Sequence, residues 1–380
     1  MEKKLSVLFL DTRPIRRGAQ VFVQELKQRF LNEGHQVKRI FLYEQKDYEQ
    51  LTLDECDLVM PFRDDHFFEK IPTIHPLLVY KLGRAIKEFS PDVILCNGSR
   101  TLKYAAVVKR SFPGISANWI YRVIDSAVYW NKRSLTQFYY RHFVIPAMDG
   151  AVGVSQKSLE EMIAHYGFRK PSVCIPRAID VDHFALFKPE ENARIKYGVP
   201  NDAFVLLFLG NFTHQKRPDR FLDIIVGIKN KIPHVHGLMV GDGPLRKSIE
   251  AQANKLGIQD QITFVGYQRD VRPWISISDV LLLTSDTEGM PGVVLEAGAM
   301  NKITISNVVG GILELIDDGV NGYIIHGGDV SLFVKRVLEV YEYPYKRLSF
   351  EKNNFHKICQ SNSINKIFES YLYYLKNSFF

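Results

Sequence analysis

Residues Asp279–Gly298, DVLLLTSDTEGMPGVVLEAG, carry the most informative pattern in this chain. It predicts an apolar strand over residues 280–283, a polar turn, and a helix that opens at Pro291. Proline suits the first helical position because the N–H that it lacks would have no partner there. The free amides of Gly292 and Val293 would then lie at a helix N-terminus, where an anionic group binds readily.

Two glutamates lie on either side of this helix start. Glu288 lies on the exit loop of the strand, and Glu296 lies four residues after Gly292 and therefore on the same helix face. Carboxylates accept hydrogen bonds from sugar hydroxyls while backbone amides hold a phosphate, and glycines allow the backbone to approach closely. Open α/β sheets bind ligands at the carboxyl ends of their strands. The stretch therefore predicts a site for a nucleotide sugar.

Length and composition limit the class of protein. The 380 residues suggest two domains of ordinary size, and 46% hydrophobic with 24% charged residues is typical of a globular protein. No stretch approaches the roughly 20 apolar residues of a membrane-spanning helix, and the apolar start of the chain is too short for a secretory signal. The four cysteines form no CxxC pair, so we expect a reduced, cytoplasmic protein without a structural metal.

The net charge of +7 is concentrated between Arg100 and His142. This window holds eight basic residues, nine aromatic residues and a single acid, Asp125. Basic residues mixed with aromatics suit an anionic membrane surface or a phosphate-bearing acceptor. A core helix with a solvated basic face explains the same pattern, so both interpretations stay open. No recognisable motif accompanies the charge, which disfavours a nucleic-acid partner.

Strands alternate with helices in both halves of the chain. Val7–Leu10 and Val37–Leu42 are expected as strands on either side of a helix, and the first loop, Asp11–Gly18, carries three arginines. The composition becomes loop-like over Pro176–Pro200, where we place the domain boundary, and a second alternation begins at Phe204. This order predicts two doubly wound parallel-sheet domains facing a central cleft.

Several segments resemble a known family. GDGPLRKSIEAQANKLGIQDQITFVGYQRDVRPWISISDVLLLTSDTEGMPGVVLEAGA is similar to the donor-binding half of the family 4 (GT4) glycosyltransferases, retaining enzymes of the GT-B fold, and VVGGILELIDDGVNGYII continues the likeness. RRGAQVFVQELKQRFLNEGHQV and IPRAIDVDHF resemble the family's first loop and its boundary segment. The resemblance implies an acceptor-side Rossmann-like domain over residues 1–185, a donor-binding Rossmann-like domain over 186–355, and a C-terminal helix over 356–380 that packs back on the first domain.

The resemblance also implies roles for individual residues. Glu288 would hold the hydroxyls of the donor sugar, Glu296 those of the ribose, and Lys216 would neutralise the leaving diphosphate. Asp125 stands near the place of a histidine that the family carries, and is the third candidate catalytic residue. The implied donor-binding set is Gly18, Arg17, Asn211, Arg217, Gly241, Gly266, Tyr267, Met290, Pro291, Gly292, Val293 and Glu296. No metal is implied.

Two departures from the family pattern affect the site. Asn211 stands where the family has an arginine, so one cation of the diphosphate site is missing, and Arg217 or the Arg16 and Arg17 loop is expected to compensate. Arg177 replaces the asparagine of the family's boundary segment. These departures leave the fold unchanged but leave the identity of the donor open.

The resemblance predicts a hexosyltransferase that moves a sugar from a UDP- or GDP-sugar to a lipid-linked or polysaccharide precursor, with retention of anomeric configuration. It would need no cofactor, and it would work in the cytoplasm, peripherally on the inner face of the membrane. Two alternatives stay open. One is a nucleotide-sugar 2-epimerase of the same fold, and the other is a non-catalytic nucleotide-sugar-binding partner subunit.

Overall fold

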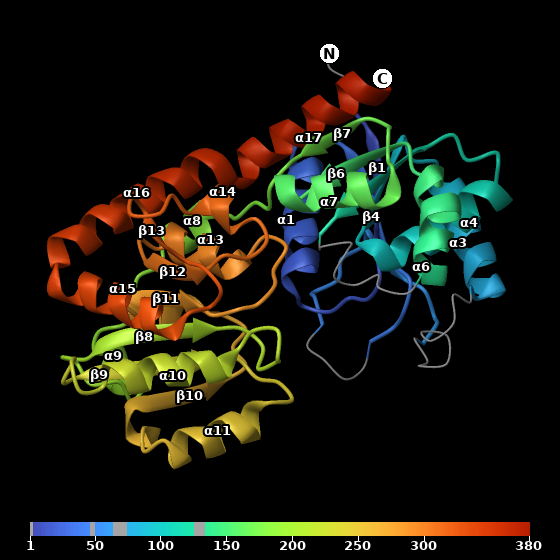
Figure 1. Ribbon diagram of the computed structural model, residues 1–380. Coiled ribbons are helices and arrows are strands. Elements are labelled where there is room, and N and C mark those ends of the chain that lie inside the picture. The colour runs from blue at the N-terminus through green and yellow to red at the C-terminus, as the bar shows by residue number, and fades with distance from the viewer. Residues whose placement is uncertain (1–2, 46–49, 64–73, 125–133) are drawn as a thin grey trace. The chain divides into compact units, whose positions relative to one another are not determined.

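The computed structural model describes residues 3–45, 50–63, 74–124 and 134–380 (Figure 1). Its contacts divide the chain into two units: unit 1 holds Met1–Ala178 and Ile364–Phe380, and unit 2 holds Ile179–Ser363. Each unit is built on one parallel sheet. The predicted fold class of two doubly wound, Rossmann-like domains is therefore confirmed. Among the helices that the structure describes, none combines the length and the hydrophobicity of a membrane-spanning segment.

The sheet of unit 1 has seven strands in the order β3-β2-β1-β4-β5-β6-β7. Its register brings the carboxyl ends of the central strands together, since Leu10 pairs with Cys96 and Asn97 pairs with Arg122. The strands are β1 (Ser6–Asp11), β2 (Gln36–Phe41), β3 (Asp57–Val59), β4 (Val93–Asn97), β5 (Asn118–Val123), β6 (Gly150–Gly153) and β7 (Ser172–Cys174).

Helices cover both faces of this sheet, so its central strands are apolar on both faces. Val7 and Phe9 pack with α1 and α17 on one face, whereas Leu8 and Leu10 pack with α3, α4 and α7 on the other. The helices are α1 (Gly18–Asn32), α3 (Pro76–Phe89), α4 (Ser99–Ser111), α6 (Ser134–Tyr139), α7 (Gln156–Tyr166) and α17 (Ile364–Phe379). A π-helical turn (Tyr140–Val144) and a 3-10 turn (Ile145–Ala147) follow α6.

The sheet of unit 2 has six parallel strands in the order β10-β9-β8-β11-β12-β13. The order reverses direction between β8 and β11, which lie side by side. The strands are β8 (Phe204–Leu209), β9 (Val235–Val240), β10 (Ile262–Gly266), β11 (Val280–Leu283), β12 (Ile303–Asn307) and β13 (Gly322–Ile325). Because all six are parallel, their carboxyl ends share one edge of the sheet.

The helices of unit 2 pack on both sides of its sheet. Phe221 of α10, Ile249 of α11 and Phe333 of α15 lie in one apolar core with the strands, while α13 packs against α16 and α8. The helices are α8 (Val181–Ala185), α9 (Ala193–Lys196), α10 (Pro218–Ile228), α11 (Arg246–Lys255), α12 (Arg272–Ile277), α13 (Gly292–Ala299), α14 (Ile312–Leu315), α15 (Val330–Glu342) and α16 (Pro344–Asn362), with a 3-10 turn over Gln259–Gln261.

The structure corrects the predicted start of the helix after β11. The prediction that the helix after β11 opens at Pro291 is wrong, because α13 begins at Gly292 and Pro291 is its N-cap residue, with an extended ψ of 108°. The fixed φ of proline suits both positions, so the residue type alone does not separate them. Strand β3 was not predicted either, because its three half-buried residues are too few to show an alternating pattern.

Candidate functional site

Two loops leave the unit 2 sheet at the point where its strand order reverses. Residues 210–217 follow β8, and residues 284–291 follow β11, the neighbouring strand. In open α/β sheets this reversal leaves a crevice outside the carboxyl ends of the strands, where ligands bind. The two predicted catalytic residues that the structure describes, Lys216 and Glu288, come from these two loops.

The structure brings Lys216 and Glu288 into direct contact. The Lys216 Nζ donates to Glu288 Oε1 over 2.6 Å, and the Ser285 Oγ donates to the same oxygen over 2.7 Å. The side chains of Lys216 and Glu288 are 23% and 10% exposed, so both are mostly buried but reach the surface. A paired lysine and carboxylate at a partly open sheet edge can give up their mutual contact to bind a ligand. The lysine then binds an anionic group of the ligand, and the carboxylate accepts hydrogen bonds from its hydroxyl groups.

The start of α13 lies beside this pair. Met290, Pro291 and Gly292 are buried, and Val293 and Glu296 are half-buried on the first turns of the helix. An eight-residue helix that starts here directs its first amides and its positive dipole end to the same edge of the sheet.

A glycine turn after β12 supports the loop that carries Glu288. The Gly311 N–H donates to the Gly289 carbonyl over 2.7 Å. Gly310 has a φ of +47°, and a Cβ there would lie 2.2 Å from the Glu288 carbonyl oxygen. Only glycine allows the two backbones to approach this closely.

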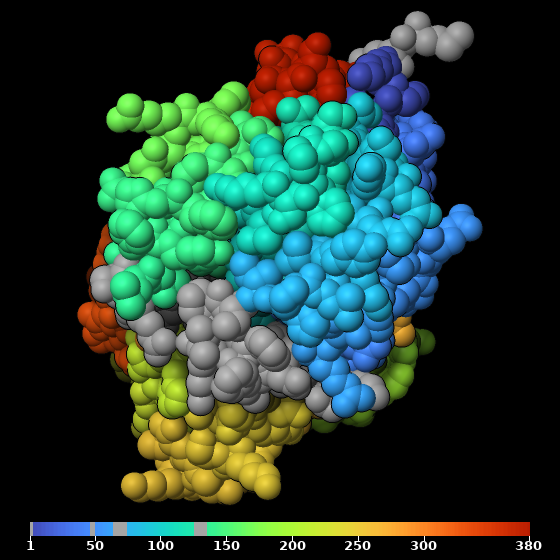
Figure 2. Space-filling view, turned by 90° about the vertical axis from the view of Figure 1, so that its right-hand side faces the viewer, coloured from blue at the N-terminus to red at the C-terminus, as the bar shows by residue number. Residues whose placement is uncertain are grey.

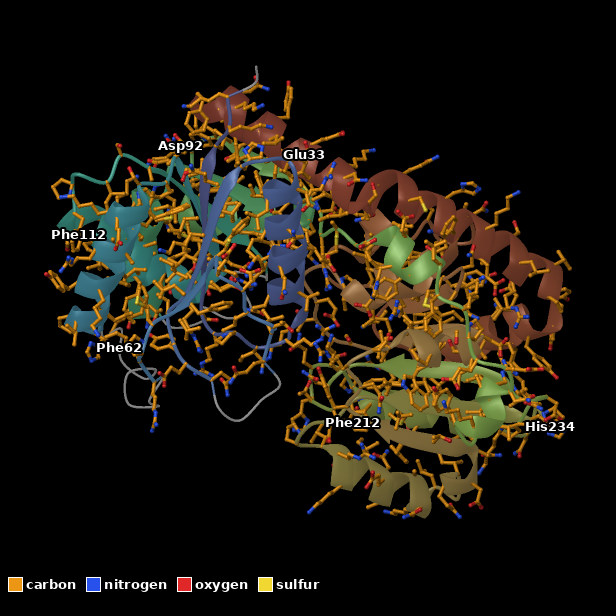
Figure 3. All side chains as sticks on the ribbon, turned by 180° about the vertical axis from the view of Figure 1, so that it is seen from behind. Glu33, Phe62, Asp92, Phe112, Phe212 and His234 are labelled. Atoms are coloured by element: carbon orange, nitrogen blue, oxygen red, sulfur yellow. The ribbon has the colours of Figure 1, made fainter. Side chains whose placement is uncertain are left out.

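The remaining predicted residues of unit 2 lie on loops of the same edge. Asn211 is exposed, and the next residue, Phe212 (labelled in Figure 3), is fully buried against Phe208 and so anchors the loop. The Gly241 N–H donates to the Gly266 carbonyl over 2.8 Å. Tyr267, which follows, is 47% exposed.

Gly241 is a second position where only glycine fits. Its φ is +137°, and a Cβ there would lie 2.0 Å from the Gly210 carbonyl oxygen. The loops after β8 and β9 therefore touch through their backbones, with no side chain between them.

Arg217 was predicted to compensate for the missing cation at Asn211, but its guanidinium contacts two carboxylates of the protein. It donates to Asp219 over 2.7 to 3.1 Å and to Asp286 over 3.1 Å. These contacts raise the pKa of Arg217, with the Asp219 hydrogen bonds as the largest cause. Burial alone raises the pKa of Asp219, but the hydrogen bonds and charge of Arg217 lower it overall.

In unit 1, the predicted residues lie at the start of α1. Arg17 is the exposed N-cap residue and Gly18 is the first helical residue. A Cβ on Gly18 would lie 2.6 Å from Nη1 of Arg177, so the absent side chain makes room for that guanidinium. Sequence reasoning noted Arg177 only as a departure from the family pattern and did not foresee this contact. Asp125 lies outside the residues that the structure describes.

The fold is shared with solved glycosyltransferases. The crystal structure of Anabaena Alr3699/HepE in complex with UDP-glucose superposes with a TM-score of 0.80 at 18% identity, over 98% of this chain and 100% of that chain. WaaG, a glycosyltransferase involved in lipopolysaccharide biosynthesis, superposes with a TM-score of 0.73 at 18% identity, over 96% and 98% of the two chains. Two parallel-sheet, Rossmann-like units of this kind define the GT-B fold, and the chain has it.

The sequence comparisons identify the family. Residues 16–183 match the family model "Glycosyltransferase Family 4", and residues 189–357 match "Glycosyl transferases group 1". The chain belongs to the glycosyltransferases that these two models describe, because the two matches together cover most of both units.

Curated relatives align with part of the chain. Lipopolysaccharide core biosynthesis glycosyltransferase LpsD of Rhizobium meliloti (strain 1021) is 26% identical over 245 residues, 63% of this chain and 62% of LpsD. Vi polysaccharide biosynthesis protein VipC/TviE of Salmonella typhi is 36% identical over 114 residues, 30% of this chain and 20% of that protein. Both alignments span less than two thirds of the relative's own length.

Proposed function

We propose that this protein is a hexosyltransferase that moves a sugar from a nucleotide diphosphate sugar to a polysaccharide or lipid-linked precursor. The observation that carries the proposal is the Lys216–Glu288 pair of 2.6 Å, which lies beside the start of α13 at the reversal point of a doubly wound sheet. The HepE complex with UDP-glucose supports the donor class, and the relatives in polysaccharide and lipopolysaccharide biosynthesis support the acceptor class.

The geometry suggests how the donor exchanges with the pair. The donor diphosphate binds the ammonium of Lys216 and the first amides of α13. These groups neutralise the charge that develops on the diphosphate as it leaves. Glu288, still held by Ser285, then accepts hydrogen bonds from the sugar hydroxyls, and Glu296 accepts them from the ribose. In the proposed step the acceptor hydroxyl attacks the anomeric carbon on the face that the diphosphate leaves. The bond from the anomeric carbon to the diphosphate oxygen breaks, the new glycosidic bond forms on the same face, and the departing diphosphate oxygen takes the proton of the acceptor hydroxyl, so the anomeric configuration is retained. Because Lys216 and the helix start supply the positive charge, the proposal includes no resident metal.

The test is transfer from UDP-glucose, and in parallel from other UDP- and GDP-sugars, to extracted lipid-linked glycan precursors in the presence of EDTA. Glu288→Ala is expected to reduce transfer about 100- to 1,000-fold, the effect of removing one preorganised polar group. The matched control is Glu190→Ala, which removes an exposed carboxylate paired with Lys196 and is expected to transfer at the wild-type rate. Wild-type turnover in Glu288→Ala would contradict the mechanism.

Product analysis separates the alternatives. Proton NMR of the first product reports whether the anomeric configuration is retained. Conversion of the donor sugar to its 2-epimer with no acceptor present would instead indicate an epimerase, and donor binding with no conversion would indicate a binding subunit.

We also propose that an anionic lipid surface is a partner of unit 1. In the 134–144 segment, Leu135 is 84% and Phe138 is 65% exposed, and the neighbouring Arg141 is exposed too. This segment lies next to α4 (Figure 2). The Arg110 guanidinium of α4 stacks on Phe143, and Arg100 of the same helix is exposed. Exposed apolar and aromatic side chains between cations match the boundary between headgroups and acyl chains.

Sedimentation with vesicles tests this partner. Wild-type protein is expected to sediment with vesicles that contain phosphatidylglycerol and to stay in solution with pure phosphatidylcholine. Leu135→Glu combined with Phe138→Glu is expected to abolish sedimentation, whereas Leu186→Glu, at a residue of unit 2 that is 76% exposed, is expected to leave it unchanged. Equal sedimentation of all variants would contradict the assignment.

A further inference from the structure

A carboxylate without an assigned role lies on the loop that carries Glu288 and contacts the segment that carries Lys216. Asp286 follows β11 by a short turn, and its side chain is 48% exposed. Its two oxygens bind two different arginines: Oδ2 accepts from Arg217 over 3.1 Å, and Oδ1 accepts from Arg220 over 2.8 Å. One carboxylate on the loop after β11 therefore binds two cations on the segment after β8.

Arg220 is the more buried of the two cations. Its side chain is 8% exposed, and it also donates to the Thr284 carbonyl. Gly328 closes the other side of the guanidinium, since a Cβ there would lie 2.4 Å from the Arg220 Cζ. A side chain enclosed in this way is held in one conformation, so it fixes the position of the carboxylate that it binds.

Arg217 lies directly after Lys216 in an unusual conformation. Its φ is +52°, in the left-handed region that is unfavourable for residues other than glycine. The Thr284 hydroxyl donates to the carbonyls of Lys216 and Arg217 over 2.9 and 3.0 Å. Strained backbone of this kind persists where surrounding contacts hold it in place, and the contacts here come from the loop that carries Glu288.

Backbone and amide hydrogen bonds continue this connection. The Asp286 N–H donates to the Gln215 carbonyl over 2.9 Å, and the Gln215 Nε2 donates to the Thr287 carbonyl over 2.8 Å. Hydrogen bonds thus join residues 215–217 to residues 284–287. Lys216 lies in the first segment, and Glu288 directly follows the second.

We propose that Asp286, through Arg217 and Arg220, is a positioning residue that sets the ammonium of Lys216 at the place where the donor diphosphate binds. Arg217 acts within this bridge and is not itself a diphosphate ligand, because Asp219 and Asp286 already balance its charge. The inference rests on the proposed function, and it deepens that function by assigning the residues behind the catalytic pair.

A double-mutant cycle on nucleotide affinity tests the proposal. UDP, GDP and ADP are each titrated calorimetrically into wild type, Asp286→Asn, Lys216→Met and the double variant. Asp286→Asn is expected to weaken binding of the preferred nucleotide about tenfold, the size of one charge-assisted hydrogen bond to phosphate. In the Lys216→Met background the same change is expected to have little further effect, because the group that Asp286 positions is gone.

Two further variants distinguish positioning from folding. Asp317→Asn is the matched control, because Asp317 is a comparably exposed carboxylate (57%) paired with Lys357 over 2.8 Å before β13, at the amino edge of the sheet. It is expected to bind nucleotide as the wild type does. Arg217→Gln removes the same bridge from the opposite loop. It is expected to weaken nucleotide binding as Asp286→Asn does, so it tests the proposal if Asp286→Asn does not fold.

The outcomes separate this inference from the proposed function. If wild type binds none of the three nucleotides, both fail. If wild type binds and Asp286→Asn either has no effect or weakens binding equally in both backgrounds, the proposed function stands and the positioning role is overturned.

Discussion

The carboxyl edges of the two sheets both carry ionic side chains, but they differ in what those side chains contact. In unit 1, Asp11 at the end of β1 binds Arg39 over 2.8 Å, and Asn97 at the end of β4 links Asp11 to Arg122. Arg122 in turn donates to the Tyr371 hydroxyl of α17 over 3.2 Å. Each of these side chains is buried.

In unit 2 the corresponding edge is partly open. Lys216 and Glu288 are 23% and 10% exposed, and their pairing joins loops that are 72 residues apart in the chain. The two sheets share the order of their first six strands, so the difference shows that one strand order can either enclose a polar network or leave one within reach of a ligand. A buried, fully paired network specifies packing, whereas a partly exposed pair can exchange partners.

The largest effect is expected from breaking the unit 1 network. Arg39→Met leaves Asp11 buried without its cation and is expected to lower the free energy of unfolding by about 3–5 kcal/mol. Urea unfolding measures the loss. The control is Arg29→Met, which removes a half-exposed pair with Glu33, the C-cap residue of α1, and is expected to cost no more than about 1 kcal/mol. Equal losses in the two variants would show that the unit 1 network is not a special source of stability.

The converse result is expected at the unit 2 edge. Lys216→Met is expected to reduce transfer about 100- to 1,000-fold, or roughly 2.7–4 kcal/mol of barrier, and to change the unfolding free energy by at most about 1 kcal/mol. Transfer rates and urea unfolding on one preparation measure both quantities. A large loss of stability with unchanged turnover would place this pair in the same structural class as Asp11 and Arg39.

A smaller effect is expected where the backbone supports the open edge. Gly310→Ala forces a side chain into a positive φ and against the Glu288 carbonyl, so it is expected to cost about 1–3 kcal/mol and to reduce transfer by displacing Glu288. Gly319→Ala is the matched control, because its φ is +75° but no atom lies within 4 Å of the new Cβ. Stability and transfer of the two are compared, and equal transfer rates would argue against a role for the close approach.

The smallest effect is a dependence on pH that belongs to unit 1. Burial, followed by the charges of Lys4 and Lys376, lowers the pKa of His35 from 6.5, and its Nδ1 accepts from the Leu5 N–H over 2.9 Å. The unfolded chain binds this proton more readily, so stability is full above pH 6.5 and decreases as the pH falls below it. Unfolding of wild type and His35→Gln at pH 7.5 and 5.5 measures the dependence. The variant is expected to lose less stability between these pH values, and identical losses would exclude His35 as the cause.

Patterns along the chain were sufficient to predict the fold class and the loops of the site. The apolar run 280–283 became β11 with the predicted limits, and β8 begins at Phe204, where the second alternation was predicted to start. A strand buried on both faces leaves such a continuous apolar signal. The family motifs placed Lys216 and Glu288 on the loops after those strands. The cap position of Pro291 and the short strand β3 escaped prediction, because local propensity leaves such boundaries ambiguous.

Which charges face a ligand and which are enclosed became clear from the folded chain alone. Arg39, Arg122, Arg217 and Lys216 are all cations in the sequence, but their surroundings differ. The first two are buried, Arg39 against Asp11 and Arg122 against Asn97 and Tyr371. Arg217 is bound by Asp219 and Asp286, and Lys216 reaches the open edge. The partner of each lies on another strand or loop and is set by sheet order and packing. Local periodicity carries no record of such long-range pairing, so the role of each charge emerges only when the chain is folded.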